Sequence, residues 1–201
     1  MKKTGSKKTD SKRLAELSLL AAIIVVLTVI CTFVKFGPFS ITLALAPIII
    51  GASIYGAGTG AFLGFIFGLV VLITGLFGWD GGTVNFLLSV NPVALIVICL
   101  GKGAAAGFVS GLIYKALEKK NMKLGVLLAG IACPVVNTGL FILGMVLFFM
   151  STLQTWAGGQ NIVTFVIVGL TGINFLIELI VNIVLASAIT AIIKYRKGLK
   201  N

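Results

Sequence analysis

Long runs of apolar residues, separated by short polar or glycine-containing segments, fill the chain from residue 14 to residue 193. A helix that crosses the hydrocarbon core of a membrane needs roughly 20 predominantly apolar residues. The pattern predicts six transmembrane helices, at residues 14–34, 41–54, 60–76, 92–117, 124–150 and 162–193. The second is short for a full crossing, so we expect it to be tilted, broken or partly re-entrant.

The segments between these runs carry turn-forming residues. A short connection covers residues 35–40, and a tight glycine-containing turn covers residues 55–59. Two longer segments, 77–91 and 151–161, are predicted to be loops on the side of the membrane opposite to the termini. Pro92 suits the first turn of the fourth helix, and Pro134 favours a kink in the fifth.

Composition supports a membrane protein, since 59% of residues are hydrophobic and 10% are charged, whereas soluble domains are about 25% charged. We therefore predict one all-α bundle of six transmembrane helices at residues 14–195. A basic tail, residues 1–13, precedes the bundle, and a second tail, residues 196–201, follows it. Neither an enzyme nor a metal or cofactor site is expected, because the chain has no His, no paired carboxylates on one helix and no phosphate-binding loop.

The basic residues indicate orientation. Of the 16, 14 lie before the first helix, in the connection after the fourth, or at the end of the sixth. An even number of helices puts these segments on one side, which the positive-inside rule makes the cytoplasm, as in a multi-pass protein of a prokaryotic cell membrane. The N-terminal tail could contact anionic lipid. Nucleic acid is not an expected partner despite the net charge of +11, because no folded basic face remains.

Two charged residues stand alone within apolar runs, Lys102 in the fourth helix and Glu178 in the sixth. A charge at a bilayer centre costs roughly 2.5 to 3.5 kcal/mol on insertion scales and usually faces a cavity or a partner. Asn137 falls at a similar depth in the fifth helix. Asn174, Glu178 and Asn182 are spaced four apart, so they share one helical face. Two interpretations stay open: a buried network that pairs Glu178 with Lys102, and a lining for a ligand or ion pocket.

The two outer segments add polar and aromatic residues near a possible entrance. The candidate binding residues there are Trp79, Asn85, Asn91 and Trp156, with Asp80, Gln160 and Asn161 beside them. An ordinary hydrated loop is the alternative. The third and fourth helices carry glycines four apart, which let neighbouring backbones approach closely and which we assign to helix packing rather than to substrate: Gly60, Gly64, Gly68, Gly103, Gly107 and Gly111.

Several segments, taken in order, carry a resemblance to a known family. They are LAELSLLAAIIVVLT, ITLALAPIIIGASIYGAGTGAFLGFIFGL, NPVALIVICLGKGAAAGFVSGLIYKAL, PVVNTGLFILGMVLFF and NFLIELIVNIVLASAI. This order, in a basic six-helix chain, resembles the S components, the substrate-capture subunits of energy-coupling factor (ECF) vitamin transporters. The resemblance covers nearly the whole chain from Leu14.

The resemblance implies capture of a small water-soluble vitamin from outside, in a pocket formed by the fourth to sixth helices. It also implies partners, namely a membrane coupling subunit and two ATPase subunits. Family members dock through a small-xxx-small motif on the first helix, which Ser18 and Ala22 match in spacing. An anion with amide and hydroxyl groups would suit Lys102 and the asparagines, so pantothenate is the preferred vitamin and riboflavin the second. The rival function is a stand-alone secondary carrier that uses Glu178 for proton coupling.

Overall fold

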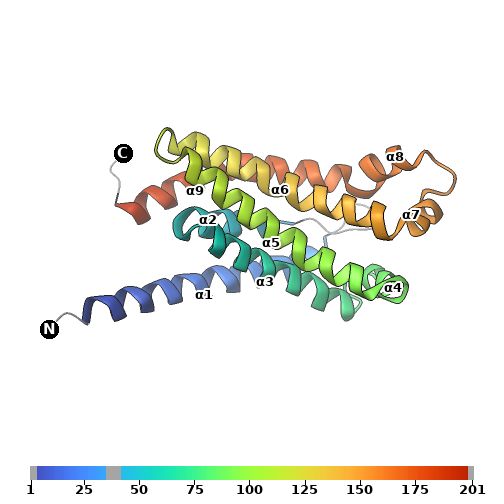
Figure 1. The fold of residues 1–201 in the computed structure, drawn as a ribbon, viewed down its shortest axis with the longest axis horizontal. Helices are drawn as coiled ribbons and strands as arrows, with labels where there is room; N and C mark the ends of the chain where they lie inside the picture. Colours follow the sequence, from blue (N-terminus) through green and yellow to red (C-terminus); the bar gives the residue numbers. More distant parts are fainter. Residues whose placement is uncertain (1–3, 35–41, 199–201) are drawn as a thin grey trace.

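Long helices that run side by side form the body of the molecule (Figure 1). A computed structural model describes residues 4–34 and 42–198, and that part of the chain contains no strand. Five helices are long and apolar enough to cross a membrane: α1 (Thr4–Thr32), α3 (Ala57–Leu76), α5 (Pro92–Leu117), α6 (Met122–Phe148) and α9 (Ile173–Lys197). The prediction of an all-α membrane protein is confirmed, whereas the count of six spans and the side of the termini stay predictions.

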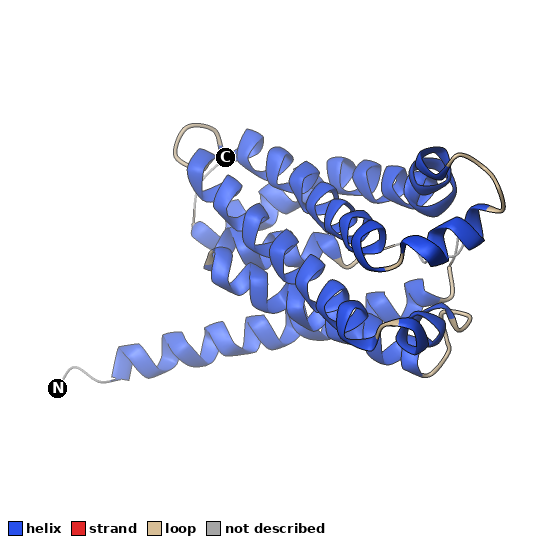
Figure 2. Ribbon diagram, turned by 45° about the vertical axis from the view of Figure 1, so that its right-hand side comes forward, coloured by secondary structure: helices blue, strands red, loops and turns tan. Residues whose placement is uncertain are grey.

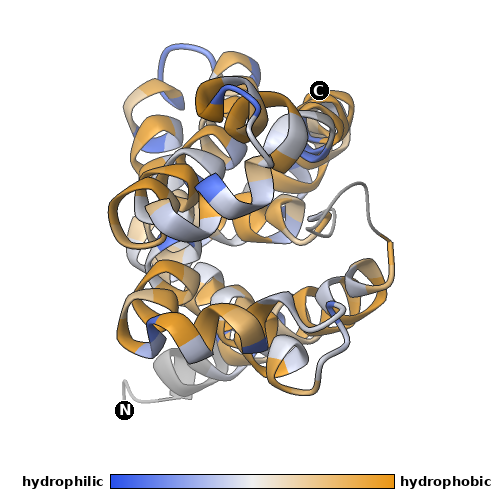
Figure 3. Ribbon diagram, turned by 90° about the vertical axis from the view of Figure 1, so that its right-hand side faces the viewer, coloured by the Kyte–Doolittle hydropathy of each residue, from blue (hydrophilic) through white to orange (hydrophobic). Residues whose placement is uncertain are grey.

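The surface of the bundle is mostly apolar. Figure 3 looks along the bundle and shows that hydrophobic residues predominate along the long helices. Large apolar side chains such as Val93, Val97, Leu147 and Val184 are more than half exposed. A soluble monomer rarely exposes so much contiguous apolar area, so lipid is the expected surrounding.

The short helix α2 (Leu45–Tyr55) lies inside the bundle and contacts α1, α3, α5, α6 and α9. Leu45, Ile48 and Ile49 are fully buried. A helix that is apolar all round belongs in a core, and eleven residues are too few to span a membrane. Gly56, with φ of 95°, alone separates α2 from α3, where we predicted a turn over residues 55–59. The predicted connection 35–40 lies outside the described residues.

Both outer segments that we predicted as loops contain a helix. The first holds α4 (Thr83–Val90), and the second holds most of α7 (Met150–Ala157). Asp80 caps α4, because its carboxylate accepts hydrogen bonds from the backbone of Gly82 and Val84 at 3.0 and 2.7 Å. Eight-residue helices flanked by glycine pairs are too short to show a clear helical period, which is why the loop prediction was wrong.

Other boundaries also differ from the prediction. The α1 helix begins at Thr4, within the segment that we predicted to be a tail. The sixth predicted helix is divided into α8 (Ile162–Thr164), the π-helix η1 (Phe165–Gly172) and α9. The Thr171 hydroxyl donates to the carbonyl of Val166, five residues earlier, at 3.1 Å. Single π-turns within α-helices, in which backbone hydrogen bonds join residues five apart, occur frequently at functional sites.

The glycines of α3 and α5 form a close-packed seam. A methyl group added at Gly60, Gly64 or Gly68 would overlap the carbonyl oxygen of Gly107, Gly103 or Cys99 across the seam. Any side chain larger than hydrogen would therefore force the two backbones apart. This confirms the assignment of these glycines to helix packing.

A polar cluster joins α1 to the ends of α2 and α9. Arg196 donates through Nε to Glu16 Oε2 at 2.8 Å, and the Tyr55 hydroxyl donates to the same oxygen. The Arg13 guanidinium lies 5.4 Å from the centre of the Tyr55 ring. Glu16 and Arg196 thus form an ion pair. Figure 2 shows the N-terminal part of α1 extending beyond the other helices, so this cluster holds α1 near the point where it leaves the bundle.

Candidate functional site

A small polar cavity of about 60 Å³ lies where α5, α6 and the junction of η1 with α9 meet. Thr42, which lies three residues before the start of α2, also lines the cavity. Four of the predicted site residues line it, together with six that we did not predict: Lys102, Asn137, Asn174 and Glu178, with Thr42, Thr138, Phe141, Leu170, Thr171 and Phe175. The structure thus brings together the charges and amides that the sequence placed at one depth.

Helical periodicity explains how these side chains converge. Asn174 and Glu178 are one turn apart on α9, and both are more than nine-tenths buried. Thr171 continues the same face three residues earlier. On α6, Phe141 lies one turn beyond Asn137 and also lines the cavity. Extending each polar stripe by one turn would have found Thr171 and Phe141 from the sequence.

Two buried oxygens of the cavity, Glu178 Oε2 and Asn137 Oδ1, have no hydrogen-bond donor among the described residues. Glu178 is hydrogen-bonded by Thr42, yet its Oε2 atom has no hydrogen-bond partner among the described residues. Asn137 Oδ1 likewise has no hydrogen-bond partner among the described residues. Buried polar atoms in proteins are nearly always satisfied, and leaving one unpaired costs roughly 1–3 kcal/mol. These two atoms therefore present acceptors to any ligand that carries N–H or O–H groups.

Lys102 supplies the positive charge of the cavity. Its Nζ atom lies 4.9 Å from the centre of the Phe141 ring, which is a cation–π contact. No ion pair within 4.0 Å joins it to Glu178 in the described part of the chain. The two groups therefore make no direct contact, although the charge of Lys102 acts on Glu178 across the cavity, and the network interpretation stays beside the pocket interpretation. The ammonium group can thus accept an anionic partner.

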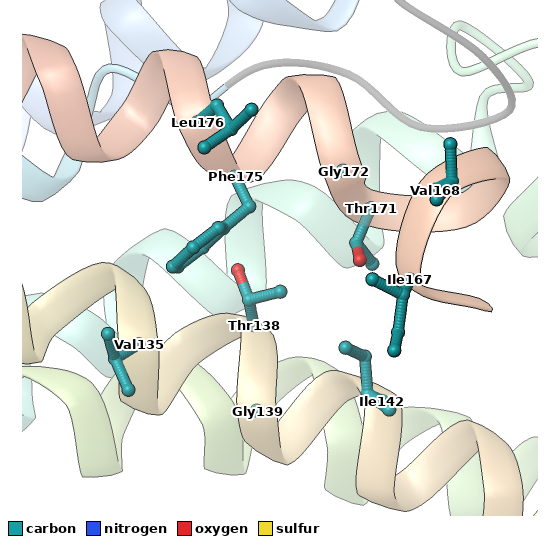
Figure 4. Close-up of a pocket in the computed structure, with 10 residues that line it drawn as sticks. All are labelled: Val135, Thr138, Gly139, Ile142, Ile167, Val168, Thr171, Gly172, Phe175 and Leu176. Carbon is teal, nitrogen blue, oxygen red and sulfur yellow. The ribbon is translucent and has the colours of Figure 1, made fainter. Parts of the chain in front are cut away.

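A larger apolar groove of about 510 Å³ adjoins the polar cavity between α6 and the η1–α9 segment. Thr138, Thr171 and Phe175 line both spaces, so their side chains form the wall between them. Figure 4 shows the Phe175 ring directed from α9 towards α6. Other lining residues, such as Ile167 and Val168, are more than half exposed on the membrane-facing surface.

The remaining predicted residues lie away from this cavity. Asn182 is buried one turn past Glu178 and does not line it. Trp79 stacks on Phe77 with ring centres 5.6 Å apart, and Trp156 packs beside Phe86 at 5.9 Å.

Two asparagines of the outer end have structural hydrogen bonds. The Asn85 amide nitrogen donates to the carbonyl of Leu76 at 3.3 Å. Asn91 caps α5 by accepting from the backbone of Ala94 at 3.1 Å. Because Lys102 lies eleven residues after Asn91, about 16 Å of helix separates this end from the cavity. The structure therefore does not bring the outer residues to the cavity.

Membership in a transport family follows from comparison with known proteins. Residues 12–190 match the family described as ECF transporter, substrate-specific component. The chain belongs to this family of transporters and is a multi-pass membrane protein. It is similar to the pantothenic acid transporter PanT of Lactococcus lactis subsp. cremoris (strain MG1363). The two are 30% identical over 196 residues, which cover 91% of this chain and 94% of the relative.

Proposed function

We propose that this chain is the pantothenate-binding subunit of an ECF-type importer, with the polar cavity around Lys102 and Glu178 as the core of its binding site. The observation that carries the proposal is the pair of buried, unpartnered acceptors, Asn137 Oδ1 and Glu178 Oε2, in a cavity that also holds one cation. The similarity to a pantothenic acid transporter supports the choice of vitamin.

The functional groups of pantothenate complement this arrangement. Its carboxylate would pair with the Lys102 ammonium group, and its hydroxyl and amide N–H groups would donate to Asn137 and Glu178. Its two geminal methyl groups would pack on Phe141 and Phe175. Riboflavin is the second candidate, but its flat tricyclic ring lacks the carboxylate that Lys102 favours.

The cavity must enlarge to hold any vitamin. A cavity of about 60 Å³ holds only a few water molecules, which is much less than a vitamin occupies. The wall of Thr138, Thr171 and Phe175 separates this space from the adjoining groove of about 510 Å³. A rotation of Phe175, or a shift of η1 and α9 away from α6, would open the needed space. The π-helix η1 is suited to such a shift because its hydrogen bonds differ from those of the α-helix that continues it.

Energy would come from partner subunits. The family supports association with a membrane coupling subunit and two ATPases, and Ser18 and Ala22 are both exposed on α1, where such docking is expected. A stand-alone carrier with Glu178 as its proton site is the rival. Uptake in proteoliposomes distinguishes the two, because an ECF importer needs ATP and its partners, whereas a proton-coupled carrier fails when a protonophore is added.

The test of the site is calorimetric titration of pantothenate into the purified chain and three variants. Lys102→Met removes the cation, and Glu178→Gln removes a charged acceptor, so each should weaken binding by at least tenfold. A hydrogen bond to a charged group contributes about 1.5–3 kcal/mol, which corresponds to this range. Lys115→Met is the matched control, because Lys115 is exposed on the same helix and outside the cavity.

The outcomes separate the alternatives. Wild-type affinity in both cavity variants would place the binding site elsewhere. Tight binding of riboflavin without binding of pantothenate would keep the class of protein and overturn the vitamin. Native mass spectrometry of the purified chain provides an independent check, because a tightly held vitamin co-purifies and its mass identifies it.

A further inference from the structure

A second groove lies at the opposite end of the bundle from α4 and α7, between the start of α6 and the end of α9. It encloses about 430 Å³ and is lined by Lys123, Leu127, Ala186, Ser187, Thr190, Ala191 and Lys194. None of these residues belongs to the polar cavity or to the apolar groove beside it. The proposed capture of a vitamin therefore leaves this groove unexplained.

The walls of the groove present little hydrogen-bonding capacity to an occupant, because they consist of apolar side chains and of hydroxyls that are already hydrogen-bonded. Its residues on α9 recur every four positions, so small side chains face α6 over two turns. Both hydroxyls on this face are satisfied within their own helix. Thr190 Oγ1 donates to the Ala186 carbonyl at 2.7 Å, and Ser187 Oγ donates to the Val184 carbonyl at 3.4 Å. The groove offers hydrocarbon surface to an occupant and makes little demand for hydrogen bonds.

Two lysines define the polar end of the groove. Lys123 is in the first turn of α6 and Lys194 is near the end of α9, and both line the same space. No acidic residue lines it, and the nearby Arg196 is already paired with Glu16. The N-terminal end of the α6 dipole adds a further partial positive charge. The polar end is therefore complementary to an anion.

We propose that this groove binds one anionic phospholipid, with its phosphate between Lys123 and Lys194 and an acyl chain along Leu127 and the small residues of α9. A cationic end joined to an apolar trough matches the two parts of such a lipid, whereas a free phosphate would use only the first. The groove opens on the surface of spanning helices, where lipid is the available solvent. The segments of Lys123 and Lys194 are predicted to face the cytoplasm, and basic pockets between helices on that side of a membrane bind anionic lipid head groups.

The experiment measures retention of lipid by native mass spectrometry of the full chain, purified in detergent and titrated with phosphatidylglycerol or phosphatidylcholine. Wild-type protein should bind one phosphatidylglycerol in preference to phosphatidylcholine. Each lysine near the surface contributes about fivefold, so the double variant Lys123→Gln with Lys194→Gln should weaken binding of phosphatidylglycerol about 25-fold. The matched control is Lys115→Gln with Lys119→Gln, which removes two exposed lysines outside the groove and should leave binding unchanged.

A second arm tests the acyl chain. Ala191→Leu fills the exposed side of the trough and leaves both lysines in place, and it should weaken binding of phosphatidylglycerol at least fivefold. Inorganic phosphate should not compete at millimolar concentration. Equal retention of both lipids, wild-type affinity in the lysine double variant, or full competition by phosphate would each overturn the proposal.

Discussion

Replacing Gly103 with alanine should loosen the glycine seam between α3 and α5. A methyl group at this position would overlap the carbonyl oxygen of Gly64 and lie 3.0 Å from a carbon of the Phe67 ring. The oxygen belongs to the backbone of the facing helix, so it cannot rotate away as a flexible side chain would. The two helices would have to separate locally. Gly101→Ala, two residues earlier on α5, adds the same methyl group where no atom of a neighbouring helix lies within 4 Å.

The expected magnitude follows from two opposing effects. Overpacking a close-packed interface costs about 1–3 kcal/mol. Alanine in place of glycine within a helix stabilises by up to about 1 kcal/mol in both variants, so this term cancels when they are compared. The free energy of unfolding of Gly103→Ala should thus fall about 1–3 kcal/mol below that of Gly101→Ala. At about 2–4 °C per kcal/mol for a chain of this size, Tm should differ by roughly 2–12 °C.

The assay is thermal unfolding of each purified variant in one detergent, followed by the fluorescence of Trp79 and Trp156 and by loss of the monodisperse peak in size-exclusion chromatography. The Gly101→Ala variant should unfold at or slightly above the wild-type temperature. If Gly103→Ala unfolds at the same temperature as Gly101→Ala or above it, the seam is not close-packed and the reasoning fails.

Two smaller effects should follow from other contacts. Arg196→Gln removes the ion pair with Glu16. Because both side chains are about one-third exposed, the stability of the whole chain should hardly change, while hydrogen exchange near the start of α1 should speed up. Unchanged exchange in α1 relative to a Lys120→Gln control would argue against a holding role for this cluster. Asn91→Ala removes the cap of α5 and should cost about 1 kcal/mol, whereas Asn91→Ser retains a capping oxygen and should cost less. Loss of pantothenate binding in the stable Asn91→Ser variant would instead indicate a binding role.

The central residues of the cavity could be predicted from the sequence because they are charged residues within otherwise apolar runs. Lys102 and Glu178 are costly in apolar runs, and counting residues along each helix placed them at one depth. Thr42 could not be found this way, because its position depends on how the chain enters α2 from another part of the bundle. Phe175 likewise reads as an ordinary apolar residue until its ring is seen between two cavities.

The outer end was predicted less well for a different reason. Asparagine and aspartate near glycine are typical both of binding loops and of helix caps, and the sequence does not distinguish these uses. In the structure Asp80, Asn91 and Asn161 accept hydrogen bonds from backbone N–H groups at helix starts. The short helix α4 follows the Asp80 cap and buries Leu87, whereas α7 has no side-chain cap at its start and buries Leu153.

The glycine seam also fixes where one end of a bound vitamin would be held. Lys102 directly precedes Gly103, so its charge is attached to the part of the molecule where two backbones are in contact and least able to move apart. Asn137 and Glu178 face it from α6 and α9, on the side that must shift to admit a vitamin. In the proposed site, the distance from a ligand's carboxylate to its hydrogen-bond donors would set how far the mobile side closes. Because one side of such a site is rigid and the other moves, the site would select its substrate by length as well as by charge.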